Sequence, residues 1–355
     1  MRPLICDMKL LHLHALPADM QLPPTAITIG NFDGVHLGHQ AMLHTLKQRA
    51  QADGLKTLVM LFEPQPLEFF KGNNAPPRIT SLREKIELLR AQGIDYVLIA
   101  RFDQAFRLLT ARQFADLLKF QLNGKALVLG DDFRFGCDRA GDRDFLRAYG
   151  FPIDTLETVL VHGERVSSTR IRNCLLQGDF NAAAQLLGRP YSITGRIQYG
   201  DQIGRTIDFP TINVALKRLT PCLHGIYVAE VQTVYAPSLP QRVAQQHHLQ
   251  PNAQHAGQTG IAGYQPQSIL GAAHVGTRPA IAQETPEWRL EVHFPDLSAN
   301  LYGLLVRVTF LHYLHGEKNY SSLEALKAGI LQDVDDVRAF RQQYSAGNAL
   351  SFLMI

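Results

Sequence analysis

The two halves of the chain differ in how their strand-forming segments are connected, and this difference limits the folds open to the chain. In the first half, short apolar runs alternate with helical segments, and the expected strands are 26–29, 57–62, 96–99 and 126–129. Strands separated by helices of this length favour βαβ units and a parallel sheet. S/T-x-x-E/Q capping boxes mark two helix starts, Ser81 with Glu84 and Thr110 with Gln113. The first half is therefore expected to form a Rossmann-like α/β domain.

After Gly188-Arg189-Pro190 the helical segments give way to strand-like runs separated by turns. Six short strands with Gly and Pro turns indicate a small closed antiparallel β-barrel. A final helix is expected from Ser321, which forms an S-x-x-E box with Glu324. The expected strands are 191–197, 211–216, 226–234, 268–274, 288–294 and 304–312.

The length of 355 residues suits two domains. We expect an α/β domain over 1–187 and a barrel domain over 188–345, with a polar insertion at 235–267. The net charge of +3 is weak and the basic residues are scattered, so nucleic-acid binding is not expected. The four cysteines form no CxxC pair, which disfavours a disulfide framework or a zinc site.

The membrane is not an expected partner, because no apolar run reaches membrane-spanning length. Charged and histidine residues interrupt the apolar character of the N-terminal segment 1–16, so it does not have the pattern of a signal peptide. A cytoplasmic location is the resulting expectation, and the pattern carries no signal for an oligomeric state.

The segment from Gly30 to His39, GNFDGVHLGH, follows the first expected strand and opens the first helix. Ligands of open α/β sheets bind at this end of the strands. The glycines allow the backbone to approach phosphate oxygens, and the helix N-terminus adds oriented N–H donors. His36 and His39 can lie on one side of the turn and stabilise charge on a phosphorus centre as catalytic residues. The segment resembles the H-x-G-H motif of the nucleotidyltransferase superfamily.

A second segment, Val166 to Arg172 (VSSTRIR), resembles the serine/threonine-rich motif of the same superfamily. Hydroxyl groups at a helix start and an arginine can hold a triphosphate from the opposite side of the site. The resemblance implies ATP as a co-substrate. The expected ATP-binding residues of this half are Gly30, Phe32, Asp33, Gly34, Gly38, Ser167, Ser168, Thr169 and Arg172.

Segments 62–70 and 130–136 both follow expected strands, so both loops should reach the sheet edge that carries the histidines. They resemble the adenylyltransferase module of bacterial bifunctional riboflavin kinase/FMN adenylyltransferases. In that family the terminal phosphate of FMN attacks the α-phosphorus of ATP and pyrophosphate leaves, without a covalent enzyme intermediate. At least one of Phe62, Phe69 and Phe133 is expected to pack in the core instead. The resemblance implies flavin binding by Phe62, Pro64, Asp132, Phe133 and Arg134.

The second half contains no P-loop motif, so a phosphoryl transfer there needs another kind of site. Segment 195–205, followed by Phe-Pro-Thr-Ile-Asn at 209–213, resembles the riboflavin kinase module of the same family. The resemblance implies that Thr211 and Asn213 hold Mg²⁺ and nucleotide phosphates. It also implies a loop over the phosphates at Gly200 and Gly204, a catalytic base at Glu291, and a flavin-side turn at 276–279 that contains Arg278.

The kinase half departs from the usual family pattern at four positions and at the insertion; the positions are Asp208, His274, His315 and Asn319. The resemblance implies an enzyme that phosphorylates riboflavin to FMN and adenylylates FMN to FAD, so that its partners are riboflavin, FMN, FAD and ATP. One alternative is an adenylyltransferase for a nicotinamide or pantetheine derivative. Another is an adenylyltransferase whose barrel only senses flavin or binds a partner.

Overall fold

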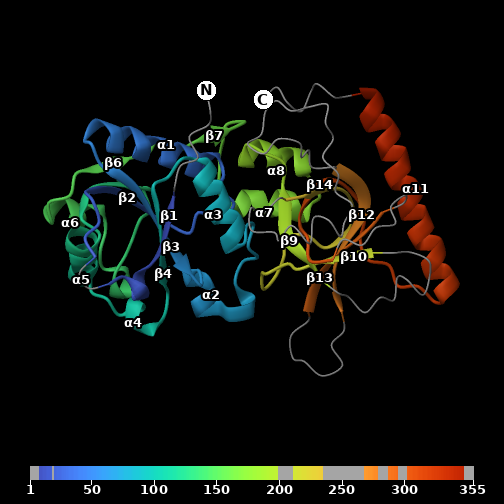
Figure 1. Ribbon diagram of the computed structural model, residues 1–355, viewed down its shortest axis with the longest axis horizontal. Coiled ribbons are helices and arrows are strands. Elements are labelled where there is room, and N and C mark those ends of the chain that lie inside the picture. Colours follow the sequence, from blue (N-terminus) through green and yellow to red (C-terminus); the bar gives the residue numbers. More distant parts are fainter. Residues whose placement is uncertain are drawn as a thin grey trace. The chain divides into compact units, whose positions relative to one another are not determined.

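The computed structural model describes residues 8–17, 20–198, 211–234, 268–278, 287–294 and 302–347. These residues form two compact units (Figure 1). The first runs to Arg172 and includes Gln185–Gly188, and the second contains Asn173–Ala184 and the chain from Arg189 onward. The predicted domain limits at 187 and 345 stay a prediction. The predicted insertion 235–267, Gly200, Gly204 and Asp208 lie outside the described residues.

The first unit is built on a six-stranded sheet in which every neighbouring pair is parallel, as predicted. Its strand order is β1-β4-β3-β2-β5-β6. The two outer strands, β1 and β6, were not predicted, because both are short and lack a buried apolar run. The strands are β1 (Lys9–His12), β2 (Thr25–Ile29), β3 (Lys56–Glu63), β4 (Tyr96–Arg101), β5 (Gly124–Leu129) and β6 (Ile153–Thr155).

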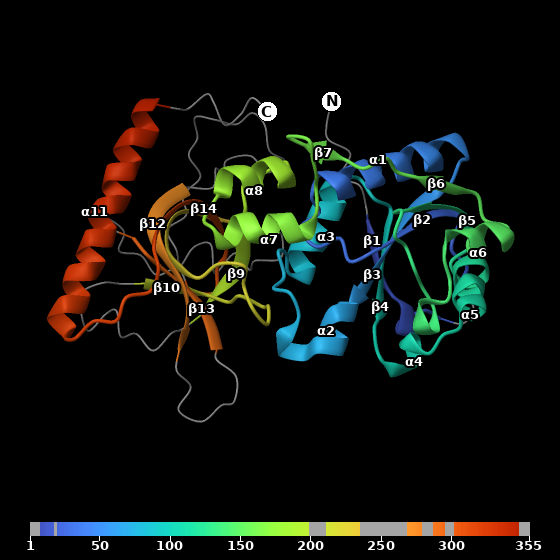
Figure 2. The ribbon, with the colours of Figure 1, turned by 180° about the vertical axis from the view of Figure 1, so that it is seen from behind.

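Two apolar cores cover the two faces of this sheet, since successive strand side chains point in opposite directions. Ile27 packs in one cluster with Phe114 of α5, and Ala26 packs in the other with Leu43 of α1. The helices of this unit lie on both sides of the sheet (Figure 2). They are α1 (Leu37–Ala52), α2 (Pro66–Lys71), α3 (Leu82–Ala91), α4 (Gln104–Arg107), α5 (Ala111–Asp116) and α6 (Arg143–Ala148). The predicted capping boxes at the starts of α3 and α5 are both present.

Three short pieces of structure follow the sheet along the chain. The strands β7 (Leu160–Val161) and β8 (Glu164–Arg165) pair as a two-stranded antiparallel hairpin. The helices α7 (Ser168–Leu176) and α8 (Phe180–Leu187) come next, and both are divided between the two units.

The second unit is a closed antiparallel barrel with the strand order β10-β13-β12-β11-β14-β9, which confirms the predicted architecture. One local expectation was wrong. The predicted turn at 276–279 is strand as far as the described residues extend, because Gly276 and Thr277 continue the pairing of β12 with β13. The strands are β9 (Ser192–Gln198), β10 (Thr211–Val214), β11 (Gly225–Thr233), β12 (Ser268–Arg278), β13 (Glu287–His293) and β14 (Leu305–His315).

The last helix, α11 (Leu323–Gly347), packs against the outer face of the barrel through Val337, which contacts Val228 and Ala272. The His315 side chain binds Asp333 of α11 across 2.7 Å. The predicted cap at Ser321 was wrong by one residue, because the Ser322 hydroxyl accepts the bond from the Ala325 N–H.

Two candidate active sites

The turn between β2 and α1 lies at the carboxyl edge of the parallel sheet, where the predicted phosphate site was placed. Gly34 has φ +85°, a conformation that favours glycine, and a Cβ there would lie 3.1 Å from the Ile79 side chain. A Cβ on Gly38 would lie 3.2 Å from the His36 ring. The turn therefore needs small residues at both positions. Gly30 directly follows β2, and Phe32 is buried beneath the turn.

His36 and His39 lie against each other, with ring centroids 3.7 Å apart. His36 caps α1, and its Nδ1 accepts the His39 N–H at 3.3 Å. A neutral His36 that accepts at Nδ1 carries its proton on Nε2 and can donate from there. Burial, and then the neighbouring His36 and Lys85, hold the pKa of His39 well below its ordinary value. His39 is therefore an uncharged imidazole at neutral pH.

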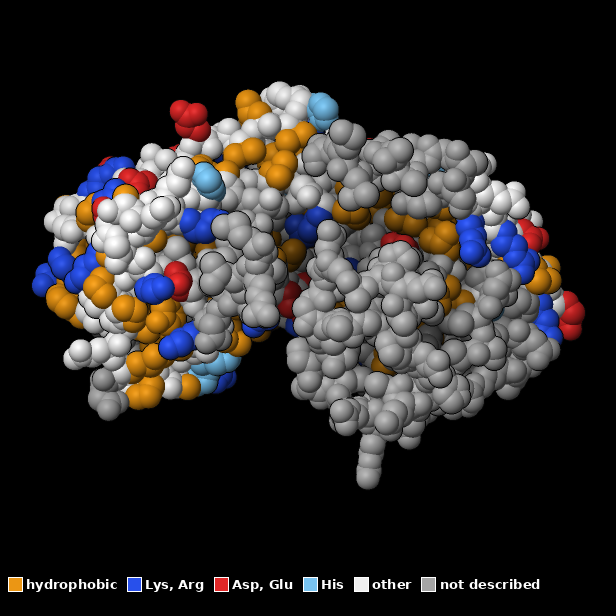
Figure 3. Space-filling model, turned by 45° about the horizontal axis from the view of Figure 1, so that its top comes forward, with side chains coloured by type: hydrophobic (Ala, Val, Ile, Leu, Met, Phe, Trp, Pro, Cys, Tyr) orange, Lys and Arg blue, Asp and Glu red, His pale blue; other side chains and the backbone are white. Residues whose placement is uncertain are grey.

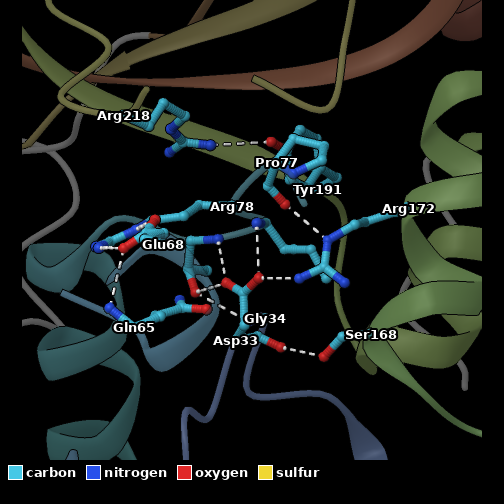
Figure 4. Close-up of polar contacts among 12 residues, drawn as sticks. Asp33, Gly34, Gln65, Glu68, Pro77, Arg78, Ser168, Arg172, Tyr191 and Arg218 are labelled. Carbon is cyan, nitrogen blue, oxygen red and sulfur yellow. Dashed lines mark hydrogen bonds and ion pairs between the residues drawn. The ribbon is translucent and has the colours of Figure 1, made fainter. Parts of the chain in front are cut away.

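Asp33 joins the turn to two other segments (Figure 4). Its buried carboxylate accepts the backbone N–H groups of Ile79 and Thr80 at 3.1 and 3.0 Å. It also binds the Arg172 guanidinium at 2.6 Å. A carboxylate with this many donors is held in one orientation, so Asp33 organises the site from within the turn.

The predicted serine-rich segment meets the turn at the same point. The Ser168 hydroxyl donates to the backbone carbonyl of Asp33 at 3.0 Å, and the Arg172 Nε donates to the Pro77 carbonyl at 2.6 Å. Ser167 accepts the Arg170 N–H, as a helix-capping residue does. Thr169 is exposed at the start of α7. The structure thus brings the two predicted phosphate-binding segments together, although their roles stay predictions.

A buried arginine that the sequence analysis did not single out lies next to this site. Arg78 makes two hydrogen bonds to Glu63, at 2.7 and 3.0 Å. It makes two more to Glu68 (Figure 4). Burial alone would raise the pKa of Glu68, but the bonds from Arg78 outweigh it and leave that pKa below its usual value. Arg78 therefore fixes α2 against the end of β3.

Three buried side-chain atoms in the described part of the chain lack a hydrogen-bond partner, and all three belong to the first unit. They are His39 Nδ1, Gln65 Nε2 and Lys85 Nζ. The Lys85 side chain is fully buried on the first turn of α3. Buried polar atoms without partners are uncommon in folded proteins, so this part of the molecule is a candidate functional site.

The predicted flavin residues of the first unit lie at the end of β3 (Phe62) and on the loops after β3 and β5, the two strands that flank β2. Phe62 is half-buried and packs edge-on against Phe102, with centroids 5.8 Å apart. Phe133 is half-buried and stacks on Phe135 at 5.6 Å. Both therefore pack partly against the core cluster, in line with the expectation for at least one of them. The remaining three, Pro64, Asp132 and Arg134, are exposed, and Arg134 pairs with Asp142 at 2.6 Å.

In the barrel unit, the predicted kinase residues share the outer face of neighbouring strands. Ile212 and Val214 of β10 are buried, whereas Thr211 and Asn213 alternate with them and are half-buried. Asn213 lies directly opposite Glu291 of β13 in the antiparallel register. Paired residues of an antiparallel ladder point to the same face, so these side chains are neighbours. For Arg278 the structure gives the backbone position, at the end of β12.

On its other side, β13 pairs with β12, which carries one of the four positions that depart from the usual family pattern. His274 of β12 pairs in register with Glu291. The His274 Nε2 is 2.7 Å from one carboxylate oxygen of Glu317, and the His224 Nε2 is 2.9 Å from the other. Burial alone would raise the pKa of Glu317, but its two histidine partners leave that pKa below the usual value.

The molecular surface in the described ranges carries mixed charge. On the face in Figure 3, Lys and Arg side chains are interspersed with acidic, histidine and apolar ones. Within those ranges no helix combines the length and the apolar character needed to cross a membrane.

Comparisons with known proteins agree with the division into two sites. The FAD synthetase family matches residues 18–170, and the riboflavin kinase family matches residues 187–341. A crystal structure described as a macrolide-efflux protein from Streptococcus pneumoniae has a TM-score of 0.69 and 26% identity, covering 90% of this chain and 96% of that one.

Curated relatives match both units at once. The bifunctional riboflavin kinase/FMN adenylyltransferase of Escherichia coli (strain K12) is 41% identical over 319 residues, which are 88% of this chain and 92% of the relative. The protein of the same description from Pseudomonas fluorescens is 40% identical and covers 88% and 91%. This chain belongs to the family of bifunctional riboflavin kinase/FMN adenylyltransferases.

Proposed function

We propose that the first unit adenylylates FMN and that the barrel unit phosphorylates riboflavin. The chain carries both activities of its family and makes FAD from riboflavin, with ATP as the co-substrate. The observation that carries the assignment of the first unit is the link through Asp33. Its carboxylate binds Arg172 and its carbonyl binds Ser168, so the two distant segments that we propose bind phosphate meet at one sheet edge.

In the first unit the nucleotide phosphates would lie between the turn and the start of α7. Backbone N–H groups of the turn and the Nε2 donor of His36 supply hydrogen bonds without a permanent charge. The terminal phosphate of FMN attacks the α-phosphorus of ATP, the bond to the pyrophosphate oxygen breaks, and pyrophosphate leaves. His36 and His39 stabilise the charge that builds up on the phosphorus oxygens. The enzyme positions the two phosphates and forms no covalent intermediate.

The flavin ring would lie over the loops that follow β3 and β5. Phe62, at the end of β3, and Phe133, on the loop after β5, carry half-buried rings on either side of the turn in the strand order. Aromatic rings suit the flat isoalloxazine system, and the Arg134 guanidinium suits the phosphate of FMN. The fixed position of Arg78 between Glu63 and Glu68 keeps the first of these loops in place.

In the barrel unit Glu291 would accept the proton of the riboflavin 5′-hydroxyl as that oxygen attacks the γ-phosphorus of ATP, the bond from that phosphorus to the bridging oxygen breaks, and ADP leaves. Thr211 and Asn213 offer oxygen atoms on the same face, next to Glu291, and oxygen is the donor that Mg²⁺ prefers. Magnesium held there would neutralise charge on the nucleotide phosphates. Asn213 and Glu291, opposite each other in register, are the pair on which this assignment depends.

Two reactions test the proposal. The full chain is supplied with ATP, magnesium and riboflavin in one tube, and with ATP, magnesium and FMN in another. Chromatography should detect FMN and FAD in the first, and FAD with an equal amount of pyrophosphate in the second. If FMN yields no FAD, the assignment of the first unit is wrong. If riboflavin yields no FMN, the assignment of the barrel unit is wrong.

The same tubes separate the alternatives raised by the sequence. An adenylyltransferase for a nicotinamide or pantetheine derivative would leave FMN unchanged. A barrel without catalysis would leave riboflavin unchanged while FMN still gave FAD. The match of the riboflavin kinase family to residues 187–341 supports neither alternative.

A further inference from the structure

The segment between β5 and α6 contains an ion pair between Arg134 and Asp142, whose side chains are 49% and 35% exposed. The Arg134 Nη1 donates to one carboxylate oxygen, Oδ2, at 2.6 Å. The other carboxylate oxygen, Oδ1, accepts the Phe145 N–H at 2.9 Å and so caps α6. The two oxygen atoms of Asp142 therefore bind different partners, and the cap does not depend on Arg134.

The backbone places the two charged residues opposite each other. Phe135 and Gly141 form an antiparallel bridge, with N–H···O distances of 3.0 and 2.9 Å. Arg134 and Asp142 directly flank this bridge, one on each arm, where paired residues face each other. The Phe135 ring is buried in the core cluster, and a Cβ on Gly141 would lie 2.5 Å from it. The position of Arg134 along the loop is therefore fixed by its neighbour.

The loop has a second tie to α6 that does not involve Arg134. The Arg143 Nη1 binds the Asp131 carboxylate at 3.0 Å. Together with the backbone bridge, this pair can hold the loop when Arg134 leaves Asp142. An exposed pair such as Arg134–Asp142 is weak, and it changes a competing binding equilibrium by at most about fivefold. The Arg134 guanidinium can therefore exchange partners while the backbone stays in place.

Both members of the pair are charged at neutral pH. The hydrogen bond from the Phe145 N–H, and then the charge of Arg134, hold the pKa of Asp142 below its usual value. A phosphate monoester such as FMN carries almost two negative charges at pH 7 and offers several acceptor oxygens. It can bind a guanidinium through two parallel hydrogen bonds, which makes it a strong competitor for Arg134.

We propose that Asp142 sets the affinity of the first unit for FMN, because it occupies Arg134 until the FMN phosphate displaces it. The proposal rests on the proposed function, in which Arg134 binds that phosphate. When FMN binds, Arg134 turns from Asp142 to the phosphate, and Asp142 keeps its bond to the Phe145 N–H. A flavin without a phosphate gains nothing from Arg134, so its affinity should not depend on Asp142.

Asp142→Asn tests the exchange in the full-length enzyme. It removes the charge but keeps an oxygen for the cap, since Asn and Asp cap helices about equally well. The KM for FMN in FAD formation should fall by about threefold to fivefold, and the KM for ATP should stay the same. Lumiflavin, which has the flavin ring but no ribityl chain and no phosphate, should inhibit FAD formation with an unchanged Ki. Riboflavin phosphorylation by the barrel unit checks that the variant is folded.

Asp103→Asn is the matched control, since Asp103 caps α4 through the Phe106 N–H at 2.9 Å and lies 3.6 Å from Arg101 in another exposed pair. It should leave the KM for FMN unchanged. Arg134→Met should raise the KM for FMN, and in that background Asp142→Asn should lose most of its effect.

The proposal is overturned if Asp142→Asn leaves the KM for FMN unchanged or raises it. It is also overturned if the Ki of lumiflavin falls by the same factor, or if Asp103→Asn lowers the KM for FMN equally. An Arg134→Met variant with the wild-type KM for FMN contradicts it whether or not Asp142→Asn folds. Failure of the proposed function would show separately, as a wild-type enzyme that makes no FAD from FMN.

Discussion

The Arg172 guanidinium lies 2.6 Å from the Asp33 carboxylate and thereby ties α7 to the turn after β2. Asp33 is 3% exposed at its side chain and Arg172 16%, so water screens this ion pair little. The same carboxylate holds the N–H groups of Ile79 and Thr80. A single buried acidic group thus sets the relative positions of three segments of the proposed nucleotide site.

Arg172→Met should destabilise the first unit and slow FAD formation. Removing one partner of a buried pair leaves the other charge unpaired, at a cost of about 3 kcal/mol. Thermal unfolding and the rate of FAD formation from FMN measure the two effects, while riboflavin phosphorylation should be unchanged. Arg83→Met breaks an exposed pair with Glu87 and should change stability by less than about 1 kcal/mol. Equal stability of the two variants would contradict the structural role of Arg172.

His39→Ala should lower kcat for FAD formation by about 100-fold, the usual effect of removing one donor to a developing negative charge. FMN formation from riboflavin should continue at the wild-type rate, because it is assigned to the other unit. His44→Ala is the control, since His44 is an exposed residue of the same helix. Steady-state rates for both reactions in all three proteins decide the matter. Wild-type FAD formation by His39→Ala would remove His39 from the reaction.

Local sequence signals predicted the site turn well. The glycines and histidines between β2 and α1 are adjacent in the chain, so their pattern alone indicates the geometry that the structure has. The capping boxes at Ser81 and Thr110 are equally local. The alternation of strands and helices in the first half was enough to predict the parallel sheet. Its absence after residue 190 was enough to predict the barrel.

Interactions between distant residues were not predictable in the same way. Lys85 looks like a solvent-facing charge of an amphipathic helix, yet its side chain is fully buried on the first turn of α3. The pairing of Arg78 with Glu63 and Glu68 depends on how α2 folds back onto β3. A charged residue carries no sequence signal for burial when its partners come from other elements.

Glu291→Gln should abolish most FMN formation from riboflavin, by about 100-fold or more, because an amide cannot accept the hydroxyl proton. FAD formation from added FMN should keep the wild-type rate. Glu230→Gln is a matched control, since Glu230 is a half-buried strand glutamate of β11 in the same barrel. Both reactions are measured by chromatography of the flavins. If Glu291→Gln phosphorylates riboflavin normally, another group must accept the proton.

The stability contributed by Glu68 should depend on pH. Its bonds from Arg78 put the folded-state pKa below the usual value, so ionised Glu68 stabilises the fold above its unfolded pKa. That contribution is lost as the pH falls through the folded-state pKa. Glu68→Gln should therefore lower Tm most near about pH 7 and progressively less below about pH 4.5. Glu87→Gln, at an exposed pair with Arg83, should show a small effect at every pH. A Tm difference for Glu68→Gln that is the same at both ends of this pH range would mean that the charge of Glu68 is not what stabilises the loop after β3.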